Sequence, residues 1–227
     1  MCCRYYVEAT PYFIELGELA QSNTMKNKAH HNEGIVSTVG EISPGTQVPV
    51  IASSKAGKKI AFLMYWGFRA KTGSLIINAR SETAAEKPMF RDAWASHRCI
   101  VPASWYYEWE HIKTPGGSEK TGSKYTIQPS GMDKTFMCGI YRLENDCPHF
   151  AILTRDPGDS ISFIHDRMPL ILPESKIGDW IKPDSDPAEL VKYAITDMSF
   201  EKMVRDDPQI ALHFDLDGKR VYETRQS

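Results

Sequence analysis

The sequence lacks the features of a membrane or secreted protein. No stretch approaches the roughly 18 consecutive apolar residues that a membrane-spanning helix requires. The first residues, MCCRYYVEATPYF, do not have the basic-then-apolar layout of a secretory signal. We therefore expect a cytoplasmic protein with no membrane association.

The sequence also lacks an excess of charge and an ordered set of cysteines. Its net charge of −2 excludes a globally basic protein that coats nucleic acid, although 27 Lys and Arg residues leave room for a local basic groove. Five scattered cysteines, an odd number, indicate no disulfide framework. Neither a CxxC pair nor an HxxxH spacing is present, so a metal site is only a remote alternative.

Short β-like runs separated by Pro, Gly and Ser make up most of the 227 residues. Apolar residues at helical spacing after Pro11 predict a first helix from Tyr12 to about Asn27, followed by an exposed loop with His30 and His31. Shorter helices are predicted near proline residues, at Met89–Ser96, Pro173–Ile181 and Pro187–Tyr193. The strand runs are predicted at Val48–Ile51, Lys59–Phe68, Arg98–Val101, Trp105–Trp109, Lys124–Ile127, Phe136–Arg142 and His149–Thr154.

Many strands with few helices indicate an α+β fold rather than a doubly wound sheet. No linker interrupts the chain, so we expect one compact β-rich domain over residues 1–227. Its strands are expected to be mainly antiparallel and to form a twisted, barrel-like sheet with peripheral helices.

Cys2 is the most unusual candidate for chemistry. If Met1 is removed, Cys2 carries a free α-amine beside its thiol, and such a 1,2-aminothiol reacts with aldehydes. The amine forms an imine and the thiol then closes a five-membered thiazolidine, helped by the high effective concentration of a tethered group. An internal cysteine cannot react in this way. The alternative is that a cysteine stands at position 2 by accident.

Asn78 and Arg80 end a strand-like segment, Ile77–Thr83. The amide can orient a nucleophile, and the guanidinium can hold a phosphate with two hydrogen bonds. A polar strand end with a solvated arginine is the alternative interpretation.

Two titratable residues lie in the other unusual segments, Arg98–Trp109 and Phe163–Pro169. Glu108 stands between large aromatic residues, where partial desolvation raises a carboxyl pKa and suits acid–base work. His165 titrates near neutrality and can pass protons to a sugar oxygen. The alternatives are a surface glutamate, sharing one strand face with Tyr106 and Glu110, and a structural histidine in a turn before Pro169.

Four features in this order resemble the SRAP family, the SOS-response-associated peptidases also called abasic-site processing proteins. They are Cys2, the Asn78-Ala79-Arg80 segment, the Trp105–Trp109 segment and the Ile164–Pro169 segment. The resemblance spans roughly residues 2 to 173. It includes Arg4, the Ser43–Thr46 turn, Trp66-Gly67, Gly139–Tyr141 and the strand that ends at Thr154. The chain departs from the usual family pattern at Cys3, at Glu41 and in the short segment after Trp66.

The resemblance implies a protein that senses abasic sites in single-stranded DNA and shields them in a covalent, lyase-like cross-link through Cys2. It assigns Asn78 to positioning the amine and sugar, Glu108 to proton transfer, and His165 to opening of the sugar ring. It assigns DNA contacts to Arg4, Arg80, Thr154 and Arg167. No metal or other cofactor is implied. We expect a monomer that acts on single-stranded DNA with abasic sites and associates with the nucleoid when bound to DNA. Replication-fork proteins are candidates for further partners.

Two alternatives remain open from the sequence. The chain could be an autoprocessing cysteine peptidase, as the family name suggests, although only Met1 precedes Cys2. It could instead be a noncovalent single-stranded-DNA-binding relative with an altered groove.

Overall fold

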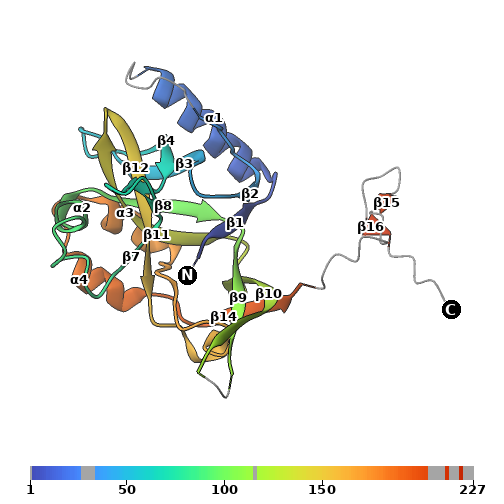
Figure 1. Ribbon diagram of the computed structural model, residues 1–227. Coiled ribbons are helices and arrows are strands. Elements are labelled where there is room, and N and C mark those ends of the chain that lie inside the picture. The colour runs from blue at the N-terminus through green and yellow to red at the C-terminus, as the bar shows by residue number, and fades with distance from the viewer. Residues whose placement is uncertain (1, 27–33, 115–116, 204–212, 215–219, 222–227) are drawn as a thin grey trace.

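The structure is a computed structural model that describes residues 2–26, 34–114, 117–203, 213–214 and 220–221. Five strands close into a small mixed barrel at its centre (Figure 1). The order around the barrel is β11-β8-β3-β4-β12, and a pairing between β11 and β12 completes the ring. All of these pairings are antiparallel except that of β12 with β4. The barrel strands are β3 (Gln47–Ser53), β4 (Lys59–Trp66), β8 (Arg98–Ala103), β11 (Thr135–Glu144) and β12 (Cys147–Arg155).

Gly139 lies on β11 where the neighbouring barrel strands leave no room for a side chain. It pairs with Cys99 on β8 and with Ile152 on β12, so strands flank it on both sides. A Cβ at this position would lie 2.9 Å from the Cys99 Sγ and 3.2 Å from the Ala151 carbonyl oxygen. A side chain here would therefore push the strands apart.

A second sheet of five strands lies beside the barrel in the order β14-β10-β9-β1-β2. Its strands are β1 (Arg4–Val7), β2 (Gly40–Ile42), β9 (Trp105–Lys113), β10 (Glu119–Pro129) and β14 (Met198–Lys202). Two short strands extend the barrel sheet from β12, namely β7 (Asn78–Arg80) and β13 (Met168–Pro169). The remaining strands form two small pairs, β5 (Phe68–Arg69) with β6 (Leu75–Ile76), and β15 (His213–Phe214) with β16 (Arg220–Val221).

Helices cover the barrel on two sides. The long helix α1 (Pro11–Lys26) packs on β3 and β4, and α3 (Ile177–Ile181) and α2 (Arg91–Ser96) pack on β8. Thr24 docks α1, because its hydroxyl donates to the Ala20 carbonyl at 2.7 Å and accepts from the Leu63 N–H at 3.0 Å. The other helical segments are α4 (Pro187–Leu190) and the 3₁₀ turns η1 (Asp159–Ile161), η2 (Glu174–Lys176) and η3 (Val191–Tyr193).

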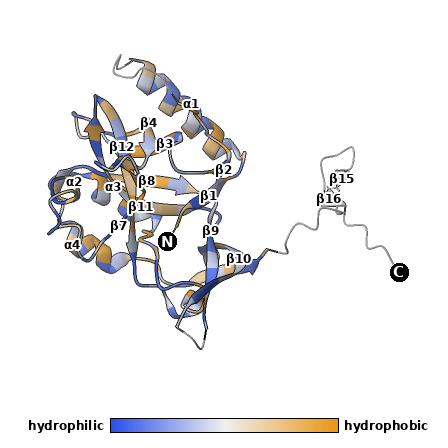
Figure 2. Ribbon diagram, in the orientation of Figure 1, coloured by the Kyte–Doolittle hydropathy of each residue, from blue (hydrophilic) through white to orange (hydrophobic). Residues whose placement is uncertain are grey.

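The barrel strands are buried on both faces, and their alternating side chains enter two hydrophobic clusters. On β8, Val101 joins the cluster that contains Cys2 and the inner face of the five-stranded sheet, whereas Ile100 joins the cluster under α2 and α3. Hydrophobic colours accordingly gather on the central strands, while the β9–β10 hairpin is largely hydrophilic (Figure 2). No helix among the described residues is long and apolar enough to cross a membrane.

The structure confirms the predicted fold class, a β-rich α+β domain with mainly antiparallel strands and peripheral helices. The first helix and the seven predicted strand runs are present, and the helix predicted at Pro173–Ile181 is a 3₁₀ turn followed by α3. The loop predicted around His30 and His31 lies outside the described residues. The sequence did not predict β1, β2, β13 or β14, and it indicated β7 only as the end of a strand-like segment. These strands are short, and the partners of β1, β7 and β14 are distant in sequence.

Candidate functional site

Cys2 lies two residues before β1, and only 1% of its surface is exposed. The Asn78 side chain donates a hydrogen bond from Nδ2 to the Cys2 carbonyl oxygen at 2.9 Å, which ties the segment to β7. The Cys2 Sγ lies 3.7 Å from the Arg4 carbonyl oxygen. Burial raises the pKa of the Cys2 thiol well above its ordinary value, and the neighbouring Glu108 carboxylate adds to the increase. The thiol is therefore protonated at neutral pH and needs a base before it can attack.

Glu108 is the carboxyl group whose charge contributes to the raised pKa of Cys2. It lies on β9 with 3% of its surface exposed, so the alternative of a surface glutamate is wrong. Its Oε1 accepts the Trp109 N–H at 3.2 Å. Burial raises the pKa of Glu108 above its ordinary value, which makes this carboxylate a stronger base than a solvated one.

His165 is buried beside His111, a residue of β9. Their ring centroids are 4.1 Å apart, and the pKa of Glu108 also responds to His111, so Glu108, His111 and His165 form one electrostatically linked group. Burial lowers the pKa of His165 to about 4. The ring is therefore neutral at neutral pH.

Two groups compete for the Nδ1 atom of His165. The Arg167 backbone N–H donates to it at 3.0 Å, and a carboxylate oxygen of Asp166 lies 2.7 Å away. The Asp166 side chain is 80% exposed and can be solvated by water, whereas a buried N–H without a partner is costly. The favoured arrangement therefore has Nδ1 accepting from Arg167, which leaves the proton on Nε2.

Asn78 and Arg80 are two residues apart on β7 and have different environments. The Asn78 Oδ1 atom is buried and accepts no hydrogen bond from the described residues, so this oxygen is available to a further donor. Arg80 is exposed and forms no ion pair with any residue that the structure describes. Its guanidinium is free to bind an anion.

Thr154 and Arg167 support the site from inside the fold. Thr154 is fully buried, and its hydroxyl points to the Ala79 carbonyl at 3.5 Å. Arg167 is 8% exposed and is held by Glu82, by Asp156 and by the Thr154 carbonyl at 2.7 Å. The observed contacts of both residues are therefore to the protein. Arg4, in contrast, is exposed on β1 and pairs with Glu41.

The sequence did not single out His111 or Tyr106 as parts of the site. The Tyr106 hydroxyl is buried and has no hydrogen-bond partner among the described residues. Burial raises the pKa of Tyr106 well above its ordinary value, with contributions from Cys2 and Glu108. Period-two alternation places Tyr106 on the same strand face as Glu108, and this was the only signal available from the sequence.

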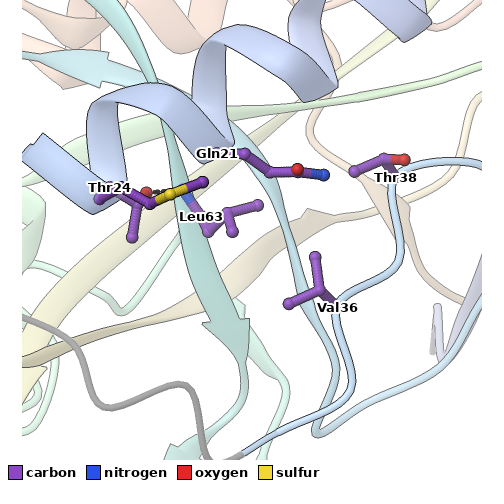
Figure 3. Close-up of a pocket in the computed structure, with 6 residues that line it drawn as sticks. Gln21, Thr24, Val36, Thr38 and Leu63 are labelled. Carbon is purple, nitrogen blue, oxygen red and sulfur yellow. Dashed lines mark hydrogen bonds between the residues drawn. The ribbon is translucent and has the colours of Figure 1, made fainter.

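An open cleft lies elsewhere, between α1 and the segment around Val36 and Thr38 (Figure 3). Gln21, Thr24 and Leu63 also line it, and it shares no residue with the Cys2 site. The cleft contains no titratable side chain, so it offers no acid–base chemistry. We therefore place the candidate functional site at Cys2.

A small mixed barrel that holds a buried cysteine beside an amide, a carboxyl group of raised pKa and a neutral histidine defines a protein with a cysteine-centred site. Residues 1–205 match the family described as SOS response associated peptidase (SRAP). The chain belongs to this family.

Curated relatives carry a common description. The abasic site processing protein YoqW of Bacillus subtilis is 31% identical over 157 residues, which cover 64% of this chain and 68% of YoqW. The abasic site processing protein YedK of Escherichia coli is 27% identical over 152 residues, which cover 63% of this chain and 64% of YedK.

The solved structures support the fold. A protein from Bacteroides thetaiotaomicron superimposes with a TM-score of 0.66 at 23% identity, over 90% of this chain and 93% of the other. A phage-related protein from Bordetella bronchiseptica gives a TM-score of 0.64 at 22% identity, over 90% of this chain and 95% of the other.

Proposed function

We propose that this protein processes abasic sites in DNA, and that it does so by cross-linking Cys2 to the aldehyde of the open deoxyribose. The first claim, that the protein processes abasic sites, is supported by its membership of the SRAP family and by relatives named abasic site processing proteins. The covalent step is supported by one observation, the placement of Cys2 between Asn78 and Glu108.

The chemistry balances as a condensation. With Met1 removed, the Cys2 amine adds to the aldehyde carbon, and loss of one water gives an imine. The Cys2 sulfur then adds to the same carbon, its proton is transferred to the nitrogen, and a thiazolidine results. No oxidant, reductant or cofactor is needed.

The neighbouring groups match the proton transfers that this condensation requires. Glu108, with its raised pKa, accepts a proton from the amine or thiol and returns it to the departing water. The free Asn78 Oδ1 accepts a hydrogen bond from the amine and aims it at the sugar. The neutral His165, protonated on Nε2, serves the sugar oxygen as the ring opens.

In this proposal, the guanidinium of Arg80 binds a phosphate next to the abasic site. Arg4 is a second phosphate contact. Thr154 and Arg167 act in this proposal by holding β7 and the His165 turn in place. The protein acts in the cytoplasm on single-stranded DNA.

The first test uses denaturing gel electrophoresis. Mature protein mixed with single-stranded DNA that carries one abasic site gives a cross-linked band, and Cys2→Ala abolishes the band because the thiazolidine can no longer close. Cys147→Ala, a matched change at a partly exposed cysteine outside the site, keeps the band. Full cross-linking by Cys2→Ala, or its loss in Cys3→Ala alone, would show that the nucleophile is assigned wrongly.

A second candidate, an autoprocessing cysteine peptidase, shares the same cysteine. It predicts that Cys2→Ala retains Met1, whereas the present proposal leaves Met1 removal to a general aminopeptidase. N-terminal mass analysis of the purified variant separates the two.

A further inference from the structure

The outer face of the five-stranded sheet combines aromatic rings with basic side chains. Side chains alternate across a strand, and the pairings of β1 with β2 and β9, and of β9 with β10, place one set of residues on the side opposite Glu108. This outer set includes Arg4, Tyr6, Glu41, Trp105, Tyr107, Trp109, Lys124 and Thr126.

Three aromatic members of this set, Tyr6, Trp105 and Trp109, are half-buried, and Tyr107 is buried among them. Tyr6 and Trp105 stack with their centroids 4.7 Å apart and their planes 4° from parallel. Lys124 places its ammonium 3.9 Å from the centroid of Tyr107 and 5.3 Å from that of Trp109. Such a combination of rings and cations is typical of surfaces that bind single-stranded nucleic acid, where bases stack and phosphates pair.

One internal carboxylate occupies the basic part of this face. Glu41 forms an ion pair with Arg4, and its second oxygen lies 3.6 Å from the Lys124 ammonium. A single acidic side chain from β2 therefore neutralises cations from β1 and β10. The Glu41 side chain is 36% exposed, so an incoming anion can reach it.

We propose that Arg4 and Lys124 form a phosphate-binding cradle for the single-stranded DNA that flanks the abasic site, and that Glu41 occupies this cradle as a competing anion when DNA is absent. The inference rests on the proposed function. A DNA phosphate displaces the Glu41 carboxylate, while adjacent bases stack on the half-buried rings of Tyr6, Trp105 and Trp109.

The energetics allow this exchange. Exposed ion pairs contribute little to stability, so a phosphate can replace the carboxylate at little cost. Glu41 then lowers affinity for any single strand and leaves the abasic site at Cys2 to select the substrate. Arg4 is two residues from Cys2 in the sequence and pairs with Tyr107, which precedes Glu108 on β9. The cradle therefore lies on the opposite face of the strand that carries Glu108.

The variant Glu41→Gln tests the proposal because it removes the competing charge and keeps a hydrogen-bonding group. Glu18→Gln is the matched control, since Glu18 is exposed on α1 and forms no ion pair with another described residue. Binding to an oligodeoxythymidine without an abasic site is followed by fluorescence anisotropy over a range of salt concentrations, and cross-linking to an abasic oligonucleotide is measured separately.

Removal of the Glu41 charge should change both the affinity for single-stranded DNA and its dependence on salt. Glu41→Gln binds the intact oligonucleotide roughly threefold to tenfold more tightly at low salt, and the slope of log affinity against log salt steepens by about 0.7 for each phosphate gained. Lys124→Gln weakens binding, and it removes most of the gain when combined with Glu41→Gln, because the two side chains act as a coupled pair. Glu18→Gln changes the affinity and the salt slope less than Glu41→Gln does.

If Glu41→Gln and Glu18→Gln bind with the same affinity and the same salt slope, the cradle proposal is wrong. The proposed function still stands in that case if the parent protein cross-links abasic DNA. Absence of both binding and cross-linking in the parent protein would overturn the proposed function and the cradle together.

Discussion

Glu108 and His165 have pKa values displaced in opposite directions by the same physical cause. Burial disfavours the charged form of each, so the pKa of the carboxyl group rises and that of the imidazole falls to about 4. Near neutrality the pair therefore offers a strengthened base and a neutral donor within one site. In water, an ordinary glutamate would be a weaker base and a histidine would be partly charged.

The variant Glu108→Gln should slow adduct formation roughly a hundredfold, because a positioned acid–base group contributes about that much or more. In the parent protein the rate should fall as the pH decreases through the raised pKa of Glu108, since protonation removes the base. The variant should lack this decline. Single-turnover rates from pH 5 to 8 measure both effects.

Glu110→Gln is the matched control, because Glu110 stands two residues further along β9 and retains the strand register. An unchanged rate for Glu108→Gln, or an equal loss for Glu110→Gln, would remove Glu108 from the mechanism.

His165 also makes the stability of the fold depend on pH. Its folded pKa of about 4 lies below the ordinary value of 6.5, so between these values the unfolded chain binds more protons. The free energy of unfolding should therefore decrease as the pH is lowered through this window. Glu108, whose folded pKa is raised, contributes with the opposite sign, and His149, whose pKa burial lowers, contributes with the same sign as His165.

Comparison of the parent protein with His165→Asn isolates the histidine. Urea unfolding at several pH values should show a shallower loss of stability on acidification for the variant. Parallel curves for the two proteins would mean that His165 is not held in its neutral form by the fold.

At the residue scale, short sequence motifs alone locate Cys2, Asn78 and Glu108, because each stands in a locally distinctive segment. The joint environment of His111 and His165 could not be predicted, since their rings meet through a contact between the β9 hairpin and a distant turn. The supporting contacts of Thr154 and Arg167 depend on β12 and its neighbours in the same way.

At the scale of elements, Arg98 joins two helices to the barrel. The residue is 1% exposed on β8, and its guanidinium donates to the Trp94 carbonyl of α2 and the Trp180 carbonyl of α3, each at 2.8 Å. It also donates to the Lys182 carbonyl that follows α3. One cation thus satisfies carbonyl groups at the C-terminal ends of two short helices, which favour positive charge there.

Arg98→Met should lower the free energy of unfolding by about 3 kcal/mol, because each buried carbonyl left without a donor costs about 1–3 kcal/mol. Chemical denaturation of the purified variant measures the change. Arg91→Met, at an exposed residue of α2 whose one ion-pair partner among the described residues is the exposed Asp92, should change stability by less than about 1 kcal/mol. Equal effects of the two substitutions would contradict the role given to Arg98.

The elements that the sequence predicted were those with strong local patterns, such as α1 after Pro11 and the apolar run of β4. The strand β7 was suspected only as a strand end, because three residues of Asn-Ala-Arg carry little β signal. Its parallel pairing with β12 requires residues more than 70 positions away, which no local pattern reveals.

At the scale of the whole molecule, two sheets cooperate to place the beginning of the chain in its own functional site. β1 pairs with β9, which carries Glu108, and Asn78 on the barrel side holds the Cys2 carbonyl. The site is therefore assembled from segments spread over the first three quarters of the sequence. Under the proposed function, this arrangement buries the finished adduct and shields it from strand scission.

The central claim is that a freed amine and the adjacent thiol of Cys2 close one ring on the sugar aldehyde. Intact mass spectrometry before and after exposure to an abasic oligonucleotide tests it directly. The account predicts one adduct, formed without borohydride, whose mass is that of the protein lacking Met1 plus the oligonucleotide minus one water. An adduct that appears only after borohydride reduction, or one that retains Met1, would contradict it.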